Sequence, residues 1–535
     1  MQAQSFDGII IGSGQHGLVL GAYLAKAGLK VLLLERRMMY GGGLSIEEVT
    51  LPGFYHNLHS INHFNLTKTP WYSDLGLDVK VPYVTPRYEF AQPHKDGTAL
   101  VFSRNLEETL SSIRRFSEKD AKTFQEWNEK AELMTKHIFL PERFSAPLSE
   151  TERRALLEKS SIGRDFLALT NMQPFDAVNT LFENERVKVL FLFKLSLFGT
   201  VLYEALNKPS PLGSTIRAFD LGAGYDLCQG GSWNLARGLM EVFIANGGTF
   251  MNQADVERIH VDGGRATGIE LTDGRVFKAG QFFASTIDVH QTFERMVGRD
   301  QLPAAYNEKI DKFHYTTWTL FGLHLALNEA PRYSSTDFDP HINQALKYNI
   351  GSETIETLLS AHKEVEQNRI PSDVQFGAGA LTQLDPKQAP PGKHTAYAWH
   401  LFPYEPNGDT HVPQDVLEHF AEQILDRWAE YAPNMTKKNI LDKYIYTAGS
   451  YTQEFPNMRH GDIFMGALTE DQVLYNHFGY RTPIEGLYMA GSPTHPNGAI
   501  SGGGGYIASS LIANDLDIKP WWKPMDIREA VAHLA

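Results

Sequence analysis

Three glycines near the N-terminus have the spacing that lets a protein backbone bind a phosphate. Gly12, Gly14 and Gly17 lie in GSGQHG, after the apolar run GIII and before LVLGAYLAKAGLK, whose spacing is helical. A second apolar run, Val31–Leu34, follows and ends at Glu35. In such a strand–turn–helix–strand unit the glycines permit a tight turn, close approach to a pyrophosphate and close helix–strand packing. An acid after the second strand binds a ribose hydroxyl, so the segment predicts a dinucleotide site.

A second glycine cluster follows Glu35 directly, in the segment RRMMYGGGL. A basic pair followed by glycines suits a loop that runs back along a pyrophosphate, because arginine pairs with phosphate and glycine backbone approaches it closely. NAD-dependent dehydrogenases do not need this element and many flavoproteins have it, so the segment favours FAD over NAD. With the first turn, it adds these expected cofactor contacts: Gln15, His16, Arg36, Arg37, Gly41, Gly42, Gly43 and Leu44.

Glycines recur near the C-terminus, in GSPTHPNGAISGGGG at residues 491–505, before the helix-like IASSLIANDL. A helix N-terminus offers unpaired N–H groups and glycine lets a ligand come close, which suits a negatively polarised ligand edge. The alternative is a plain turn before a C-terminal helix. In the middle of the chain, QGGSWNL leads into a helix-like run and then the strand of Val256, which we expect to contact the adenine end of the cofactor.

The composition excludes several classes of function. Of the 535 residues, 42% are hydrophobic and 21% charged, so two or more globular domains are expected. The net charge of −14 argues against nucleic acid as the main partner. The single cysteine, Cys228, excludes internal disulfides and favours the reducing cytoplasm, and no export signal is recognised. Lys188, Lys194 and Glu204 interrupt the apolar run 187–206, which predicts a buried helix rather than a membrane span.

Taken together, these motifs resemble the phytoene-desaturase-like FAD oxidoreductases, within the amine-oxidase-like flavoprotein fold. The resemblance spans nearly the whole chain and is most specific in YRTPIEGLYMAGSPTHPNGAISG. It is strongest toward the carotenoid-ketolase branch and the pyridine-nucleotide-disulphide-oxidoreductase-domain proteins. It implies an α/β fold, with a Rossmann-like FAD-binding domain of the GR2 type and a discontinuous α+β substrate domain. Asn497 and Ala499 replace family glycines, and Ser492 replaces an acid that many flavoproteins have there.

The resemblance also assigns roles to residues at the C-terminal end. Gly491 would end the last strand beside the ribityl chain, and residues 497–501 would present helix N-terminal N–H groups to the pyrimidine edge of a non-covalent FAD. It further implies these cofactor contacts: Gly491, Ser492, Asn497, Gly498, Ala499 and Ile500. His59 and His495 are the candidate catalytic residues by analogy, since histidine titrates near neutrality. The alternative is that both only orient loops, and the histidine spacing predicts no metal site.

The order of the motifs predicts interleaved domains. The FAD-binding domain is expected at residues 1–85, 220–300 and 450–518, the substrate domain at 86–219 and 301–449, and a tail at 519–535. The predicted helix 187–206 and a predicted strand at 313–327 are expected to wall an apolar substrate tunnel.

The function that these observations predict is an FAD-dependent oxidoreductase. It would remove a hydride from a C–H bond of a largely apolar small molecule and pass the electrons to oxygen, a quinone or another acceptor. Two alternatives remain open: a flavin amine or amino-acid oxidase, and an FAD-containing binding scaffold without turnover. Contact with a membrane surface and association into a homo-oligomer are also left open.

Overall fold

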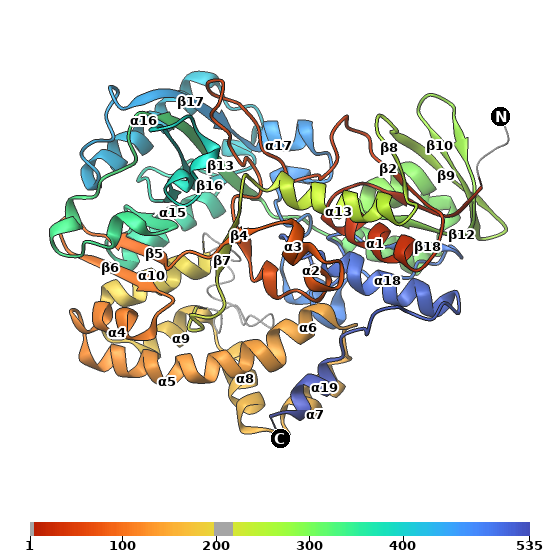
Figure 1. Ribbon diagram of the computed structural model, residues 1–535, viewed down its shortest axis with the longest axis horizontal. Helices are drawn as coiled ribbons and strands as arrows, with labels where there is room; N and C mark the ends of the chain where they lie inside the picture. The colour runs from red at the N-terminus through yellow and green to blue at the C-terminus, as the bar shows by residue number, and fades with distance from the viewer. Residues whose placement is uncertain (1–4, 197–217, 535) are drawn as a thin grey trace.

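The computed structural model describes residues 5–196 and 218–534, and its two large sheets lie at opposite ends of the molecule (Figure 1). The first sheet is five-stranded, and all its neighbouring strands are parallel. Its order is β18 (Leu487–Met489), β12 (Ala279–Ser285), β1 (Phe6–Ile11), β2 (Val31–Leu34) and β8 (Thr249–Met251). The predicted α/β fold class is confirmed, whereas the domain boundaries stay a prediction.

Both faces of this parallel sheet are buried, which explains why its strands are continuous apolar runs. Ile10 and Leu33 pack toward a core that contains the helices α1 (Gln15–Lys26), α13 (Trp233–Ala245) and α18 (Gly503–Asp515). Ile9 and Leu32 point the opposite way, toward a core shared with β9 (Val256–Asp262) and β10 (Arg265–Leu271). The alternation of side chains along each strand therefore divides the residues between two cores.

Helix α1 is buried along its length up to Ala25, because α13 and α18 both pack against it. A Cβ on Gly505 would collide with the backbone of His16, so glycine at this position lets α18 come close to α1. One sequence-based expectation is wrong here: residues 497–501 do not form a helix N-terminus, since α18 begins at Gly503 with Gly502 as its N-cap. Asn497 and Ala499 instead have positive φ angles of 72° and 74°, which places them in a tight loop.

The second sheet has seven strands and is mixed, with one parallel pair. Its order is β17 (Ile440–Tyr446), β13 (Trp318–Leu327), β16 (His394–Pro403), β15 (Phe376–Gly379), β14 (Lys347–Ile350), β5 (Tyr88–Pro93) and β6 (Ala99–Ser103). The strand expected at 313–327 thus begins at Trp318 rather than at 313.

The two faces of the seven-stranded sheet pack against different neighbours. Phe321, Leu323 and Leu325 of β13 contact the core that includes α16 (Gln414–Tyr431). On β16, Tyr397, Trp399 and Leu401 point to the opposite core, together with the helical segment between β6 and β7 (Tyr225–Cys228). This second face is the one that looks toward the centre of the molecule.

Of the described helices between β6 and β7, most lie along the lower left of Figure 1, with α6 and α7 toward its lower centre. They are α4 (Leu106–Arg114), α5 (Glu118–Met134), α6 (Leu140–Phe144), α7 (Glu150–Leu157), α8 (Ser161–Asn171), α9 (Pro174–Leu181) and α10 (Glu185–Ser196). The predicted helix 187–206 is seen as α10 up to Ser196, and its remainder lies outside the described residues. Val187, Leu190 and Phe191 of α10 are buried in the core, as predicted for an apolar helix.

Further strands and helices lie elsewhere in the described residues. They are β3 (His63–Phe64), α2 (Pro70–Asp74), α3 (Leu77–Lys80), β4 (Tyr83–Val84), β11 (Val276–Phe277), α14 (Ala304–Lys312), α15 (Ile355–Glu366), α17 (Ala448–Glu454) and α19 (Ile527–Ala532). Before α19, Trp521 stacks on Tyr23 of α1 at 5.1 Å between ring centroids, and Trp522 meets the same ring edge-on. The paired tryptophans therefore pack the tail against α1.

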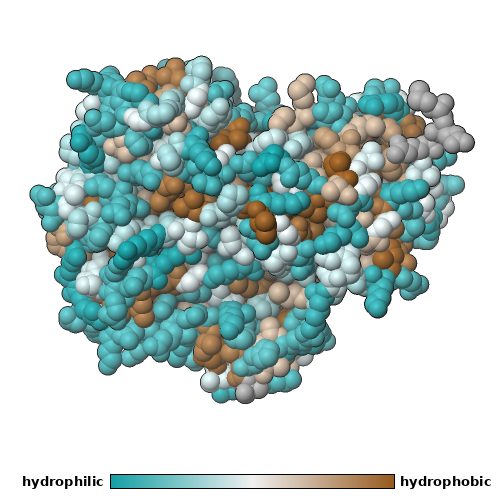
Figure 2. Space-filling view, viewed as in Figure 1, coloured by the Kyte–Doolittle hydropathy of each residue, from teal (hydrophilic) through white to brown (hydrophobic). Residues whose placement is uncertain are grey.

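No helix in residues 5–196 and 218–534 is both long and apolar enough to cross a membrane. On the face shown in Figure 2, hydrophobic residues form separate small groups interrupted by hydrophilic ones.

Because α1 and α18 are in close contact, we expect one added methyl group at their interface to destabilise the folded protein. We expect Gly505→Ala to lower the free energy of unfolding by about 1–3 kcal/mol, because the new Cβ would overpack against backbone that cannot rotate away. The control is Gly449→Ala in α17, where the nearest atom would be 3.9 Å away; it should be neutral or stabilise by up to about 1 kcal/mol. Denaturant unfolding of both variants measures the difference, and equal stabilities would contradict the packing argument.

Candidate functional site

A cavity of about 280 Å³ lies between the parallel sheet and the seven-stranded sheet. The carboxyl ends of β1, β2 and β12 reach it through Gly12, Glu35 and Thr286. From the opposite side, Trp318 of β13 and Trp399 of β16 line it. Ligands of open parallel sheets bind outside the carboxyl ends of the strands, so this cavity has the expected position for a dinucleotide site.

Two glycine loops meet at the edge of this cavity. Gly41 N–H donates to the carbonyl oxygen of Ser13 at 3.0 Å, and a Cβ on Gly42 would lie 3.1 Å from Gly14 Cα. A Cβ on Gly14 would meet nothing within 4 Å, so its backbone faces open space. Gly14 is also the N-cap of α1 and provides no side-chain cap, which leaves the first N–H groups of the helix available to an anion.

Glu35 holds the first of these loops in place. Its Oε2 accepts hydrogen bonds from the backbone N–H of Ser13 at 3.0 Å and from the Ser13 hydroxyl at 2.7 Å. Its Oε1 accepts only the backbone N–H of Arg37, at 2.9 Å, among the described residues. A carboxylate oxygen can accept two hydrogen bonds, so Oε1 retains capacity for a ligand hydroxyl on the cavity side.

The two arginines predicted to follow a pyrophosphate bind protein groups instead. Arg36 donates to the carbonyl oxygen of Glu454 at 2.9 Å, and the Arg37 guanidinium forms an ion pair with the Glu454 carboxylate. Arg37 also lies over the ring of Phe455, 4.3 Å from its centroid. Both arginines line the cavity, but their guanidinium groups tie the second glycine loop to the end of α17.

The C-terminal loop reaches the cavity through part of its length. Gln15 bridges to it: its side-chain amide donates to the carbonyl oxygen of Ala499, and its Oε1 accepts the N–H of Gly502 at 2.9 Å. Ala499 and its neighbours Ser492 and Ile500 line the cavity. A Cβ on Gly498 would collide with the Phe464 backbone, so this glycine allows a close approach within the protein rather than to a ligand.

The structure thus divides the residues predicted to contact the cofactor. Those that line the cavity are Gly12, Gly14, Gln15, His16, Glu35, Arg36, Arg37, Gly41, Gly42, Gly43, Leu44, Val256, Ser492, Ala499 and Ile500. Those among the described residues that do not are Gly17, Gly491, Asn497 and Gly498. A Cβ on Gly17 would collide with Gly12 O and one on Gly491 with Thr286, so both glycines act by packing.

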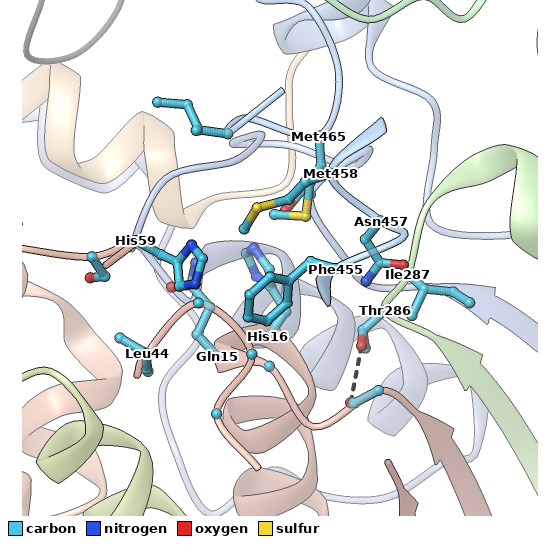
Figure 3. A pocket seen from close by; sticks show the side chains of 18 of the residues that line it. Gln15, His16, Leu44, His59, Thr286, Ile287, Phe455, Asn457, Met458 and Met465 are labelled. Atoms are coloured by element: carbon cyan, nitrogen blue, oxygen red, sulfur yellow. Dashed lines mark hydrogen bonds between the residues drawn. The ribbon is translucent and has the colours of Figure 1, made fainter. Parts of the chain in front are cut away.

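His59 lines the cavity close to Phe455 (Figure 3) and is surrounded by aromatic rings. The rings of Tyr446, Tyr451 and Phe455 meet it edge-on, with centroids 5.0, 5.5 and 4.5 Å away. Burial, aided by the charge of Arg37, lowers the pKa of His59 to about 3, so the imidazole is neutral near pH 7. Its Nδ1 is buried and has no hydrogen-bond partner among the described residues.

His495, the other candidate catalyst, is fully buried and does not line the cavity. Its Nε2 donates to the carbonyl oxygen of Glu142 at 2.7 Å, which ties the C-terminal loop to α6. Burial lowers its pKa to about 4. The geometry therefore indicates a structural role for His495. His59 is the candidate catalytic residue that lines the cavity.

Glu47, His59 and Glu454 resemble a metal site, because one potential ligand atom of each side chain lies within 4.8 Å of those of the other two. Glu454 is already engaged, by the ion pair with Arg37 and by the Tyr446 hydroxyl, which donates to its Oε2 at 2.6 Å. We therefore interpret this group as a hydrogen-bond network that leads from His59 to the surface, where the Glu454 side chain is 26% exposed.

The far wall of the cavity is aromatic. The ring centroids of Phe64 in β3 and Tyr225 in β7 are 5.3 Å apart, and those of Trp318 and Phe464 are 6.3 Å apart. Buried Lys347, at the start of β14, places its Nζ over the Tyr225 ring, 2.9 Å from the centroid. Among the described residues that line the cavity, the carboxylates are Glu35, Asp255 and Glu454, and Glu454, the last residue of α17, is already paired with Arg37. The aromatic wall is thus suited to an apolar ligand.

Several lining residues were missed from the sequence. The main ones are Asn62, Phe64, Tyr225, Thr286, Ile287, Lys347, Trp399, Phe455, Asn457, Met458, Phe464 and Met465. Thr286 could have been found, because it directly follows a strand of the parallel sheet; its hydroxyl donates to the carbonyl oxygens of Ile11 at 2.8 Å and Gly12 at 3.1 Å (Figure 3). The others carry no local motif. The cavity also corrects the predicted tunnel: Trp318 alone of β13 lines it, and no described residue of α10 does.

The fold and the glycine loops define a dinucleotide-binding protein, and residues 10–75 match the family model described as an NAD(P)-binding Rossmann-like domain. Three relatives align over nearly the full length of the chain. A limonene dehydrogenase component of Castellaniella defragrans is 29% identical, over 98% of this chain and 97% of the relative. Pyridine nucleotide-disulfide oxidoreductase domain-containing protein 2 of Rattus norvegicus is 24% identical, over 96% and 94%. A lycopene-forming phytoene desaturase of Paracoccus is 24% identical, over 95% and 97%.

Solved structures show the same fold. Cyclohexylamine oxidase of Brevibacterium oxydans superimposes with a TM-score of 0.57 at 15% identity, covering 96% of this chain and 100% of that one. The chain is therefore similar over nearly its full length to a limonene dehydrogenase component and a phytoene desaturase, and it has the fold of an amine oxidase.

The buried neutral state of His59 predicts a pH effect on stability. Its pKa is about 3 in the folded protein and about 6.5 when unfolded, so between these values the unfolded state binds more protons. Stability should therefore fall as the pH is lowered from 6.5 toward 3, by about 1.4 kcal/mol per pH unit for this group. We expect His59→Gln to unfold with a shallower pH dependence of Tm between pH 7 and 5 than the unsubstituted protein. An unchanged slope would contradict the assigned burial.

Proposed function

We propose that the chain is an FAD-dependent oxidoreductase that dehydrogenates a largely apolar small molecule. One observation carries the proposal: the same cavity is lined by the glycine loops and Glu35 on one side and by an aromatic wall on the other, where Trp318 and Trp399 come from the seven-stranded sheet. A cofactor held by the loops would thus meet a substrate held by the wall. Limonene dehydrogenase and phytoene desaturase are named for hydrocarbon substrates, which agrees with such a wall.

The residues present fit FAD. Gly14 leaves room beside the uncapped start of α1, where a pyrophosphate would accept N–H hydrogen bonds. Glu35 keeps acceptor capacity for a ribose hydroxyl. Cys228 is buried, lies outside the cavity lining and has its thiol pKa raised to about 12 by burial, which supports a non-covalent cofactor.

When bound, FAD would supply the acceptor for the hydride. The chain's own residues would do the rest. Trp318 and Trp399 would orient the substrate and exclude water from the reacting C–H bond. Loss of a second hydrogen as a proton completes the formation of a double bond. His59 would pass that proton on rather than hold it, because its pKa is about 3, and the Tyr446 hydroxyl, 3.4 Å from its Nε2, leads to Glu454.

A flavin amine oxidase is the second candidate, and the aromatic rings of the wall are the observation that favours it. Aromatic faces attract ammonium groups. Against it, the Lys347 amino group already covers the Tyr225 ring. Among the described residues that line the cavity, Glu454 is already paired with Arg37, and the other carboxylates, Glu35 and Asp255, lie at the parallel sheet. We therefore propose a neutral substrate rather than an amine. Oxygen, a quinone or another molecule would take the electrons, and membrane contact and self-association are further proposals.

The role of Glu35 can be tested on FAD binding directly. We expect purified protein to hold one FAD that is released into solution on acid precipitation, and Glu35→Ala to weaken FAD binding by roughly 10- to 100-fold, because a hydrogen bond to a charged group is lost. Equilibrium dialysis gives the dissociation constant, with exposed Glu257→Ala of β9 as the matched control. Flavin that stays with the precipitate, or an unchanged dissociation constant in Glu35→Ala, would contradict this part of the proposal.

The substrate class can be tested by anaerobic flavin reduction. Neutral alkenes, cyclic ketones, alcohols and primary amines would be mixed with the FAD-bound protein, and bleaching of the flavin absorbance recorded. We expect reduction by neutral apolar compounds. Reduction by amines alone would replace the proposal with the amine oxidase, and reduction by no compound tested would favour a binding scaffold.

A further inference from the structure

Two N–H donors in the wall of the cavity have no acceptor in the protein. They are Trp399 Nε1 and one N–H of Asn62 Nδ2, and both nitrogen atoms are buried. Trp399 Nε1 has no hydrogen-bond partner in the described part of the chain. The Asn62 amide faces the Tyr397 hydroxyl, which can take only one of its two N–H groups. Both residues line the cavity. We infer that the substrate carries an oxygen acceptor, a carbonyl, hydroxyl or ether oxygen on an otherwise apolar molecule, which binds to these two donors. The inference rests on the proposed function and narrows its substrate class.

The register of the sheet explains why Trp399 has no partner. On β16, Trp399 lies between Tyr397 and Leu401 on the face that looks toward the cavity. Its cross-strand neighbours are Gly322 on β13 and Gly377 on β15. A side chain on a strand usually contacts the side chains directly opposite it on the neighbouring strands. Opposite Trp399 both residues are glycines, which have no side chain. The indole N–H therefore has no lateral acceptor from the sheet, although the residue is only 9% exposed.

A buried donor without an acceptor is costly, so such groups are uncommon in native proteins and call for an explanation. Phe64, Trp318 and Phe464 present mainly apolar surface to the cavity. The ring of Tyr397 lies 5.6 Å from that of Trp399 between centroids, but its hydroxyl makes no hydrogen bond to the indole. An indole N–H only donates, so the missing partner must be an acceptor. This conclusion does not depend on the orientation chosen for the Asn62 amide.

The donors also carry no formal charge, which distinguishes them from the groups on the nucleotide side. Neutral donors match a neutral oxygen better than a phosphate, which binds to charged side chains and helix N-termini. The site therefore selects one oxygen on the substrate and fixes the position of the rest of the molecule against Trp318. A pure hydrocarbon would fill the same space and leave both donors unpaired.

The experiment compares two ligands of the same shape, cyclohexanone and methylenecyclohexane, in the FAD-bound protein. Calorimetry gives their dissociation constants without turnover. We expect Trp399→Phe to weaken cyclohexanone binding by about 3- to 10-fold, the value of one neutral hydrogen bond, and to change methylenecyclohexane binding by less than about twofold. Asn62→Leu, which keeps the side-chain size, should act in the same direction and keeps the test available if Trp399→Phe folds poorly.

Trp233→Phe is the matched control, since it removes another buried, unpartnered indole N–H at the start of α13, outside the cavity lining. It should leave both ligands unaffected. An equal change for ketone and alkene in Trp399→Phe, no change for either, or a loss of FAD as large as the loss of ketone, would overturn the inference. Failure of the proposed function would appear separately, as absence of anaerobic flavin reduction.

Discussion

Close contacts between glycine backbones at the carboxyl end of β1 are the constraint on which the rest of the structure depends. A Cβ on Gly17 would collide with Gly12, one on Gly505 with His16, and one on Gly42 would lie 3.1 Å from Gly14. These contacts bring the first turn, the second glycine loop and α18 to one point, although they are far apart in sequence. A side chain at Gly17 or Gly505 would force these elements apart, whereas one at Gly42 would require only a small shift of its neighbour.

The polar side chains beside these glycines already form hydrogen bonds with other protein groups in the absence of a ligand. Glu35 accepts two hydrogen bonds from Ser13, and Gln15 bonds to both Ala499 and Gly502. Each side chain is thereby fixed, and a ligand would not have to order it. Such preorganisation lowers the entropic cost of binding and holds reacting groups in a defined geometry. Arg37 follows the same principle, since its ion pair with Glu454 positions the second loop.

The opposite wall is built in a different way. The seven-stranded sheet places alternate residues of β16 on its two faces, so Ala398 packs toward α16 while Tyr397 and Trp399 face the centre. Glycines beside Trp399 leave its indole N–H without a lateral partner. On the nucleotide side, the backbone and polar groups thus form hydrogen bonds within the protein. The opposite wall is mainly apolar and carries a few N–H donors without acceptors among the described residues. In the proposed function, these two sides would accommodate a cofactor and a substrate that differ in polarity.

The sequence by itself determined the nucleotide side, because Gly12, Gly14, Gly17 and Glu35 lie within one contiguous strand–helix–strand unit whose geometry is local. It also predicted the buried helix that begins near Val187, from its apolar pattern. Only the tertiary structure separated His59, which faces the cavity, from His495, which bonds to Glu142. The start of α18 at Gly503 was likewise invisible, since every glycine in that loop permits several backbone conformations. The aromatic wall comes from residues as distant as Phe64 and Phe464, and long-range packing rather than any local pattern brings them together.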